Sequence, residues 1–460
     1  MLKERKIYEF GAHEMVQAIF ARKLTSTQIM TACLERIREI EPTVRAWAFL
    51  DEDAAMAQAH DIDSAFSEEK ERGLLYGVPV GVKDVFNTID MPTCMGSPIW
   101  EGFMPGNDAR VVTNLRRNGA LIPGKTVTAE FSVHYPGPTL NPHDVKRMPG
   151  TSSTGSTVAV ATGMVPVALG TQTAGSTIRP ASYCGIYGYK PSFGLIPRTG
   201  VLKTLDTLDH VTWLSRNIED LKLMLDTLRV GGENYPYINK EVDLSKKLEV
   251  DHAWKIAFVR TPMWNCAEPY TRQAMLDFVR KLKEKNINVC EVDLPPIFEK
   301  AHSVHKTIYS KALSYYFKDE SIKHRDLISD VMLKMIEEGE EISFKTYQQA
   351  LEDQVHLAAT LDNFFRDYVI ILSHATAGQA PMIQSIEKPD PCLMWTLCHV
   401  PAIGVPAFVE PEGFTFELQL VGRRYKDYSL LNFVQFLKKQ GLIHDCPVVD
   451  INQETKVLAR

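Results

Sequence analysis

One segment of the chain matches the phosphate-loop pattern G-x-x-x-x-G-K-[ST] at every fixed position, from Gly119 to Thr126 (GALIPGKT). Such a loop binds phosphate when a strand precedes the first glycine, so that successive backbone N–H groups turn toward the anion. Here residues 109–118 are predicted to be helical, the Ala-Leu-Ile run resembles a strand, and the proline has no N–H to donate. Nucleotide binding is therefore kept only as an alternative.

Other common hydrolase patterns do not fit. The nucleophile elbow G-x-S-x-G is absent around the serines between residues 152 and 176. The S-x-x-K pattern occurs at Ser67–Lys70 and Ser303–Lys306, but neither S-D-N nor K-T-G accompanies it. The histidines lack the H-E-x-x-H spacing of zinc enzymes. We therefore expect a reaction that needs neither a metal nor a cofactor.

Two blocks of small residues could instead build a serine hydrolase site. The first is Pro149 to Ser156 (PGTSSTGS), and the second is Thr171 to Ala181 (TQTAGSTIRPA). A Gly-Ser turn after a strand presents consecutive N–H donors around a hydroxyl, as an oxyanion hole requires. Serines in such turns often bond only to backbone, so the combination, and not any one serine, indicates catalysis. Lys83 follows the apolar run at 77–82 (GVPVGV), where burial would make it a neutral base.

These segments resemble the amidase signature family. The resemblance rests on the strand that ends in Lys83-Asp84, the Ser-Ser-x-Gly-Ser block, the T-x-x-G-S turn with Arg-Pro-Ala, and the segment that begins at Cys184 (CGIYGYKPS). It extends to residues 401–406 (PAIGVP) and 418–423 (LQLVGR), covers most of the chain, and is closest to the malonamidase-like branch. A G-A-x-x-x-G-K-T segment is common in this family, which accounts for the apparent phosphate loop.

The resemblance implies a Ser-cisSer-Lys triad. Ser176 would be the nucleophile, Ser152 the bridging serine in an unusual cis peptide, and Lys83 the base. Lysine serves as a base only when it is uncharged. To be half neutral near pH 7.4, its pKa must fall by about three units, which corresponds to about 4 kcal/mol and which burial can supply.

The resemblance also places the oxyanion hole on the turn that carries the nucleophile. Its donors would be the backbone N–H groups of Thr173, Ala174, Gly175 and Ser176. Thr151, Thr154 and Ala174 stand where family members usually have glycine. Because Ala174 carries a methyl group beside the anion hole, we predict that its φ is not strongly positive.

Ser153 and Arg179 are the candidate substrate-binding residues. Ser153 would assist by hydrogen bonding to the triad. Arg179 follows the nucleophile closely, and its guanidinium could bind a substrate carboxylate in a bidentate manner. It could equally pair with a nearby carboxylate or loop carbonyl of the protein, and both interpretations stay open.

The alternation of strands and helices predicts an α/β fold with a mixed central sheet covered by helices on both faces. Strands are predicted at 77–82, 120–122, 165–169, 256–259, 287–292, 369–372, 402–405 and 417–421. Helices are predicted at 26–40, 51–70, 109–118, 269–285, 300–316, 322–338, 343–366 and 427–439. We interpret the chain as a single amidase domain (1–460) that comprises N-terminal helices (1–70), a signature core (76–215) and a remaining α/β layer structure (250–460).

Composition excludes several classes of protein. Of the 460 residues, 45% are hydrophobic and 23% are charged, which is typical of a folded water-soluble chain. A net charge of −6 gives no electrostatic reason to expect a nucleic-acid partner. The longest small and apolar run, 156–169, is too short to cross a membrane, and no secretory signal is recognisable. Eight cysteines without a C-x-x-C pair favour reduced thiols in the cytoplasm.

The expected function is hydrolysis of a carboxylic amide C–N bond through a serine acyl-enzyme, with release of ammonia or an amine. We expect the substrate to be a small amide or a urea derivative, and a homodimer is consistent with the family. One alternative is a glutamine-hydrolysing subunit of the amidotransferase A type. Less favoured are a phosphate-loop nucleotide-binding protein and a catalytically inactive scaffold.

Overall fold

A computed structural model describes residues 5–66, 72–231, 242, 254–385 and 387–451. Within these residues, eleven strands form one sheet. In spatial order they are β1 (Trp47–Leu50), β3 (Gly124–Thr126), β2 (Val80–Lys83), β4 (Val167–Gln172), β6 (His210–Ser215), β5 (Tyr187–Lys190), β10 (Ala402–Val409), β11 (Thr415–Gly422), β9 (Ile370–His374), β7 (Lys255–Val259) and β8 (Asn288–Val292). The pairs β2–β3, β2–β4, β7–β8 and β7–β9 are parallel and the others are antiparallel, so the predicted mixed sheet is confirmed.

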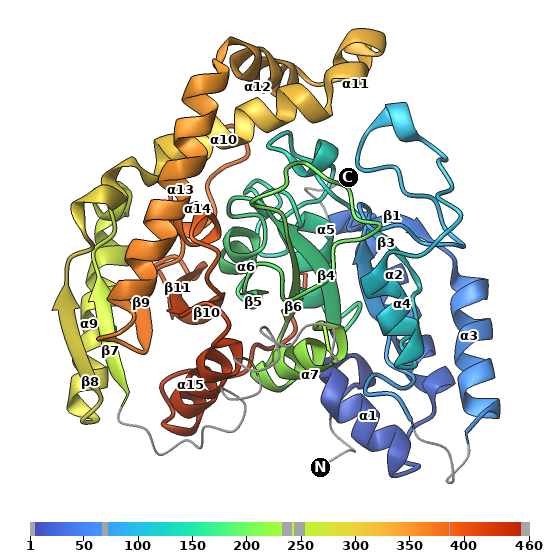
Figure 1. Ribbon diagram of the computed structural model, residues 1–460. Coiled ribbons are helices and arrows are strands. Elements are labelled where there is room, and N and C mark those ends of the chain that lie inside the picture. The colour runs from blue at the N-terminus through green and yellow to red at the C-terminus, as the bar shows by residue number, and fades with distance from the viewer. Residues whose placement is uncertain (1–4, 67–71, 232–241, 243–253, 386, 452–460) are drawn as a thin grey trace.

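Helices cover both faces of this sheet, as predicted (Figure 1). They are α1 (Ala12–Phe20), α2 (Ser26–Val44), α3 (Glu52–Ser64), α4 (Arg110–Arg117), α5 (Thr154–Ala161), α6 (Ile178–Cys184), α7 (Ile218–Leu228), α9 (Pro269–Glu284), α10 (Ala301–Tyr316), α11 (Lys318–Lys323), α12 (Asp330–Glu341), α13 (Phe344–Phe364), α14 (Cys392–Leu397) and α15 (Asp427–Lys439). Helices α10, α11 and α12 lie at the top of the view in Figure 1, α13 runs from there down the left side, and α1, α7 and α15 lie near the base.

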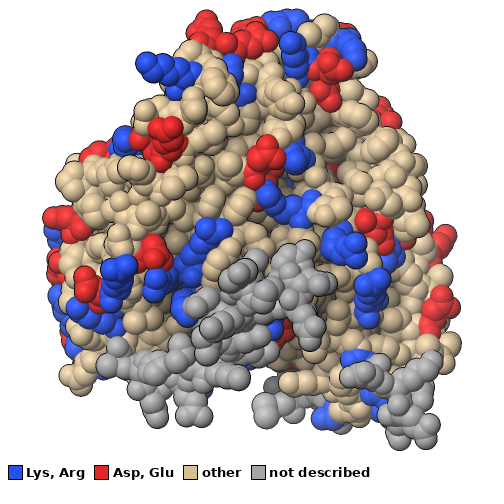
Figure 2. Space-filling model, viewed as in Figure 1, with Lys and Arg blue, Asp and Glu red and all other residues tan. Residues whose placement is uncertain are grey.

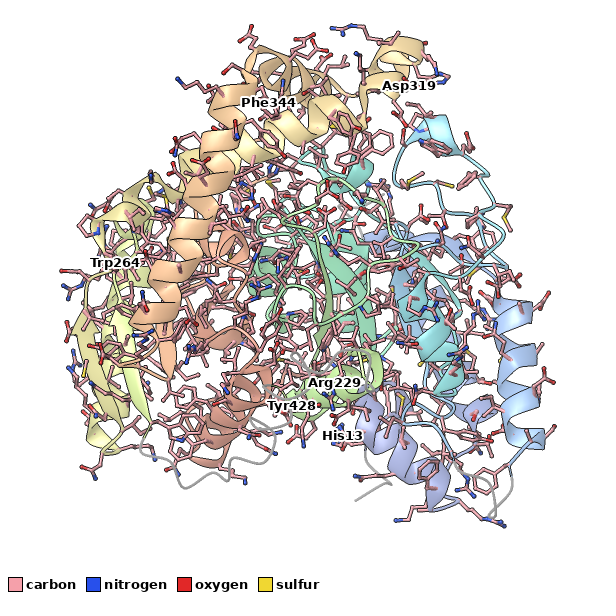
Figure 3. All side chains as sticks on the ribbon, in the orientation of Figure 1. His13, Arg229, Trp264, Asp319, Phe344 and Tyr428 are labelled. Atoms are coloured by element: carbon pink, nitrogen blue, oxygen red, sulfur yellow. The ribbon has the colours of Figure 1, made fainter. Side chains whose placement is uncertain are left out.

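The core lies on both sides of the sheet because successive strand residues point to opposite faces. On β9, Leu372 packs into the cluster that includes α7 and α15, whereas Ile371 packs into the cluster with α10 and α13. Side chains fill the layers on either side of the sheet (Figure 3). Near the base, the guanidinium of Arg229 lies 5.7 Å from the ring centre of Tyr428.

Three predicted elements are wrong in detail. The helix predicted at 51–70 ends at Ser64 in α3, and positions 67–70 of that prediction lie outside the described residues. The helix predicted at 322–338 is interrupted, because α11 ends at Lys323, a 3-10 turn spans Arg325–Leu327, and α12 begins at Asp330. Ser329 caps α12, and its N–H also donates to the Glu130 carboxylate at 3.1 Å, which fixes the break. The strand predicted at 120–122 is only an isolated bridge at Leu121, and the regular strand is β3.

On the face that Figure 2 shows, acidic and basic side chains are interspersed over tan surface. Among the described residues, no helix has both the length and the apolar character needed to span a membrane.

Candidate active site

Lys83 is the last residue of β2, and its side chain is fully buried. Its Nζ lies 2.8 Å from Ser152 Oγ, 3.1 Å from Ser153 Oγ and 2.7 Å from Thr171 Oγ1. All three partners are uncharged hydroxyls. Burial lowers the pKa of the amine well below that of a free lysine, while the charge of Asp209 opposes this effect. These surroundings favour the neutral amine that a general base requires.

Ser152 and Ser153 are buried immediately before α5. The peptide bond between Thr151 and Ser152 is cis. Ser153 Oγ donates to the carbonyl of Thr171 at 3.1 Å, and Ser153 N donates to the carbonyl of Ser176 at 3.2 Å. The structure therefore brings the two small-residue blocks together beside the lysine.

Ser176 lies in the turn between β4 and α6 and is partly exposed, unlike the fully buried Ser152. Within the described part of the chain, Ser176 Oγ forms no hydrogen bond, and its link to Ser153 is through the backbone. Of the three predicted triad residues, Ser176 is thus the one that an incoming substrate can reach.

The turn from Thr173 to Ser176 has every carbonyl fixed. The four acceptors and their donors are Thr173 O with His305 Nε2 at 2.9 Å, Ala174 O with Thr396 Oγ1 at 2.8 Å, Gly175 O with Arg179 N at 2.9 Å, and Ser176 O with Ser153 N at 3.2 Å. Among the described residues, none of the four N–H groups of this turn has an acceptor. Because the C=O of one residue and the N–H of the next point in opposite directions across a peptide unit, the fixed carbonyls of Thr173, Ala174 and Gly175 set the directions of the Ala174, Gly175 and Ser176 N–H groups. An oxyanion hole needs such fixed donors.

Gln172 is a site residue that the sequence analysis missed. Its Oε1 accepts from Thr177 N at 3.0 Å and Ile178 N at 3.1 Å at the start of α6. Its Nε2 donates to Thr396 Oγ1 at 3.1 Å, and that hydroxyl holds the Ala174 carbonyl. The Gln172 amide therefore joins β4, α6 and α14 around the turn.

His305 on α10 also escaped the sequence analysis. It donates through Nε2 to the carbonyl of Thr173, since a carbonyl oxygen can only accept. Burial lowers the pKa of His305 to about 4, so the ring is neutral at physiological pH. His305 acts as a fixed donor to the turn, at a position too remote in sequence for a local pattern to reveal it.

The three residues that replace family glycines are accommodated without left-handed backbone. Thr151, Thr154 and Ala174 do not adopt a positive φ, which confirms the prediction for Ala174. At Gly175 two side chains approach the backbone closely. A Cβ at this position would lie 3.0 Å from Arg179 Nη2 and 3.1 Å from Cys392 Cβ.

Arg179 is buried beside this turn and pairs with two carboxylates of the protein. Its Nε donates to Asp390 Oδ2 at 2.6 Å, and its Nη1 donates to Glu387 Oε2 at 3.2 Å. Of the two interpretations of Arg179, this geometry supports the internal ion pair. Binding of a substrate carboxylate stays a prediction, and two anions already occupy the guanidinium.

The phosphate-loop pattern does not form a phosphate site. Gly124-Lys125-Thr126 is strand β3, and Gly119 ends the turn after α4 with φ +79°. Lys125 is fully buried, lies 3.2 Å from Asp84 Oδ1, and donates to Thr93 Oγ1 at 2.8 Å. The Lys125 amine therefore bonds to groups of the protein, whereas a phosphate-binding lysine must point toward its ligand.

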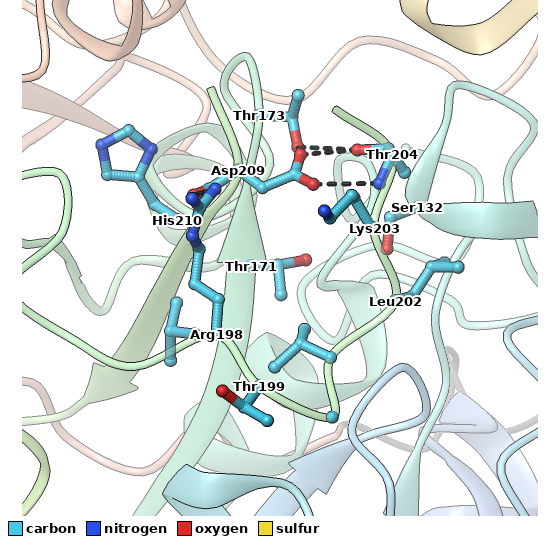
Figure 4. A pocket seen from close by; sticks show the side chains of 13 residues that line it. Ser132, Thr171, Thr173, Arg198, Thr199, Leu202, Lys203, Thr204, Asp209 and His210 are labelled. Carbon is cyan, nitrogen blue, oxygen red and sulfur yellow. Dashed lines mark hydrogen bonds between the residues drawn. The ribbon is translucent and has the colours of Figure 1, made fainter. Parts of the chain in front are cut away.

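A cavity of about 470 Å³ borders the site. Thr171, the partner of Lys83, and Thr173, the first residue of the turn, both line it (Figure 4). Arg198, Thr204 and Asp209 also line it. Among the described residues, no group of three His, Cys, Asp or Glu side chains is placed to hold a metal ion.

Comparison with known proteins assigns the family. The Amidase family model matches residues 28–431, and the chain therefore belongs to the amidase family. One relative is an A-type subunit of the glutamyl-tRNA(Gln) amidotransferase of Clostridium acetobutylicum, which is 28% identical over 95% of this chain and 100% of its own length. This chain is an amidase, an enzyme that hydrolyses amide C–N bonds.

Solved structures share the fold. A chain described for the evolutionary origins of an s-triazine catabolic enzyme superposes with a TM-score of 0.85 at 24% identity, covering 95% of this chain and 99% of that chain. The peptide amidase of Stenotrophomonas maltophilia gives a TM-score of 0.81 at 23% identity, covering 96% of this chain and 99% of the other. At these identities the likeness establishes the architecture alone.

Proposed function

We propose that this amidase works through an acyl-enzyme on Ser176. Lys83, uncharged, accepts the Ser176 proton by way of Ser152 while Ser176 Oγ forms a bond to the amide carbonyl carbon. The N–H groups of the turn bind the resulting oxyanion. The C–N bond then breaks, and the amine or ammonia leaves with the proton that Lys83 returns through Ser152. Water attacks the acyl group by the same relay and releases the carboxylic acid.

One observation carries this proposal. Lys83 Nζ is buried, and its hydrogen-bond partners are the hydroxyls of Ser152, Ser153 and Thr171. A lysine that only stabilises the fold would be expected to pair with a carboxylate, because an unpaired buried ammonium is costly. Ser153 holds the amine and Thr171 in place, which supports its role as an assisting residue.

The test is an ammonia-release screen over a library of small amides and urea derivatives. Ser176→Ala should abolish turnover of every substrate that the wild type accepts. Ser182→Ala is the matched control, because Ser182 lies on the following helix with its hydroxyl 2.9 Å from Thr376 Oγ1. Full activity in Ser176→Ala would end the assignment of the nucleophile.

The cavity beside the site supports a small substrate. Its volume of about 470 Å³ suits a compact amide or urea derivative better than a long chain. Five hydroxyl side chains line it, from Ser132, Thr171, Thr173, Thr199 and Thr204, which favours a polar acyl or leaving group.

The relationship to a component of a glutamyl-tRNA amidotransferase favours a second candidate, hydrolysis of glutamine with transfer of ammonia to a partner protein. Glutamine carries a carboxylate, and Arg179 is already paired with Asp390 and Glu387. We therefore favour simple amides over glutamine. Comparing ammonia release from L-glutamine and from propionamide, and testing for copurification of a second protein, separates the two candidates.

We also propose a cytoplasmic location and a homodimer. All eight cysteines are free, and a reducing compartment keeps thiols in this state. The homodimer rests on the family resemblance, and light scattering on the purified protein tests it.

A further inference from the structure

Asp209 is a half-buried acid at the wall of the cavity, and the proposed reaction does not use it. Asp209 directly precedes β6, and Thr173 directly follows β4. Because Gln172 pairs with His210 in the sheet, Asp209 and Thr173 lie opposite each other. Thr173 Oγ1 accordingly donates to Asp209 Oδ1 at 2.8 Å (Figure 4). The carboxylate thus holds the first residue of the turn that presents the proposed oxyanion donors.

The surroundings of Asp209 are built for a carboxylate. Oδ1 also accepts from Thr204 Oγ1 at 2.6 Å, and Oδ2 accepts from Thr204 N at 2.9 Å and Leu205 N at 3.0 Å. Backbone N–H groups can only donate, so both hydrogen bonds to Oδ2 favour the unprotonated oxygen. Desolvation raises the pKa of Asp209 above that of a free aspartate, and the four donors around its two oxygens oppose this effect by stabilising the charged form.

Several charged or titratable groups surround Asp209. Arg198 Nη1 donates to its backbone carbonyl at 3.1 Å, and Lys203 lines the same cavity. Burial and the charge of Asp209 raise the pKa of Tyr309 on α10, and the same charge opposes the lowering of the Lys83 pKa by burial. Thr171, which lies 2.7 Å from Lys83 Nζ, lines the same cavity as Asp209. Lys203 is exposed and pairs with Asp206. Lys83 is the group among these that must change its protonation during catalysis.

We propose that Asp209 is a positioning residue with two separable effects on the reaction: its hydrogen bond to Thr173 orients the oxyanion turn, and its negative charge sets the pH at which Lys83 becomes an effective base. The inference rests on the proposed function, because it assumes the roles of Lys83 and Ser176. An anion near an amine stabilises the ammonium form and therefore raises the pH at which the amine loses its proton. Asp209 thus limits how far burial can depress that pH.

The experiment measures the rate of Ser176 phosphonylation by an alkyl fluorophosphonate between pH 5 and pH 10. In this step the Ser176 oxygen forms a bond to phosphorus, the P–F bond breaks, fluoride leaves, and Lys83 receives the serine proton. The rate reports the nucleophilicity of Ser176 without knowledge of the natural substrate. Mass spectrometry identifies the labelled residue.

Three variants separate the two effects. Asp209→Asn removes the charge, and its carboxamide oxygen can still accept from the two backbone N–H groups. We expect the midpoint of the pH–rate profile to move down by about one pH unit, and the plateau rate to fall about tenfold because the turn is held less firmly. Thr173→Val keeps the charge and should lower the plateau without moving the midpoint. Asp206→Asn removes an exposed carboxylate three positions away and should leave both unchanged.

The outcomes distinguish the inference from the proposed function. A wild-type protein that is not labelled at Ser176 would refute the proposed function itself. Labelling at Ser176, with the same midpoint in Asp209→Asn as in Asp206→Asn, would refute only the role of Asp209. If Asp209→Asn does not fold, as judged by circular dichroism, Asp209→Glu replaces it. That variant should keep the wild-type midpoint with a reduced plateau, and a wild-type plateau would overturn the positioning role.

Discussion

Two lysines, Lys83 and Lys125, lie on the neighbouring parallel strands β2 and β3, and both side chains are fully buried. Lys83 contacts the hydroxyls of Ser152, Ser153 and Thr171. Lys125 instead lies 3.2 Å from the carboxylate of Asp84. Asp84 follows Lys83 in sequence, yet its carboxylate pairs with the other lysine.

We infer from this difference that the charge of the contacting partner, and not burial, separates the proposed base from a structural cation. Burial lowers the pKa of both amines. At Lys125 the Asp84 carboxylate in contact opposes this effect, whereas at Lys83 the opposing charge is that of Asp209, to which the amine is not hydrogen-bonded. Asp84 lies in the turn directly after β2, and its carboxylate pairs with Lys125 and not with the proposed base.

The largest expected effect is on turnover. Lys83→Met preserves the length of the side chain but removes the base, and amide hydrolysis should fall by about 10³-fold or more. The thermal midpoint should stay at or above that of the wild type, because the buried amine has no anionic partner in contact. Ammonia release and a melting curve measure the two quantities. Retention of a tenth of the activity would contradict the assignment of Lys83.

Lys125→Met should show the reverse pattern. It leaves the Asp84 carboxylate buried without its cation, which should reduce the free energy of unfolding by about 3 kcal/mol. Turnover per folded molecule should stay close to that of the wild type. Urea unfolding with parallel activity measurements checks this, and a loss of turnover without loss of stability would mean that the two lysines do not have different roles.

The pH dependence of stability should distinguish the wild type from Lys83→Met. The pKa of Lys83 is depressed in the folded state, so between that value and the ordinary lysine pKa near 10.5 the unfolded chain binds more protons. Stability contributed by this group therefore rises with pH across that window. Urea unfolding at pH 7 and pH 9.5 measures this effect. The free energy of unfolding of the wild type, relative to that of Lys83→Met, should be larger at pH 9.5 than at pH 7, and a constant difference would contradict the depressed pKa.

The smallest effect compares one hydroxyl partner of each lysine. Thr171→Val removes one contact of Lys83 but leaves both serines, and kcat/KM should fall about threefold to tenfold. Thr93→Val removes the matching contact of Lys125, and we expect a stability loss of about 1 kcal/mol with unchanged kcat/KM. Equal effects of the two substitutions on kcat/KM would weaken the comparison.

Much of the fold follows from local pattern. The apolar run at 77–82 predicts a buried strand that ends at Lys83, and β2 confirms it with a start at Val80. The break between α11 and α12 could not be predicted, because it depends on Glu130, a residue 199 positions from Ser329. Helical periodicity continues through this region, and only the tertiary contact shows where the helix ends.

The candidate site likewise contains residues that local motifs predict and residues that only tertiary contacts reveal. Lys83, Ser152 and Ser176 occur in motifs whose resemblance is specific, so their convergence could be anticipated. His305 and Thr396 lie 132 and 222 positions from the carbonyls that they hold, and neither belongs to a motif. The partners that shape the turn are therefore visible only in three dimensions, even where the reactive residues can be read from one sequence.

The four anchored carbonyls between residues 173 and 176 tie this short stretch to donors from α10, from α14, from the start of α5 and from α6. A local opening of any of these helices would release a donor before the central sheet is disturbed. Activity therefore depends on helices far apart in the sequence. On heating or limited proteolysis, the enzyme should lose its activity while most of its secondary structure is still intact.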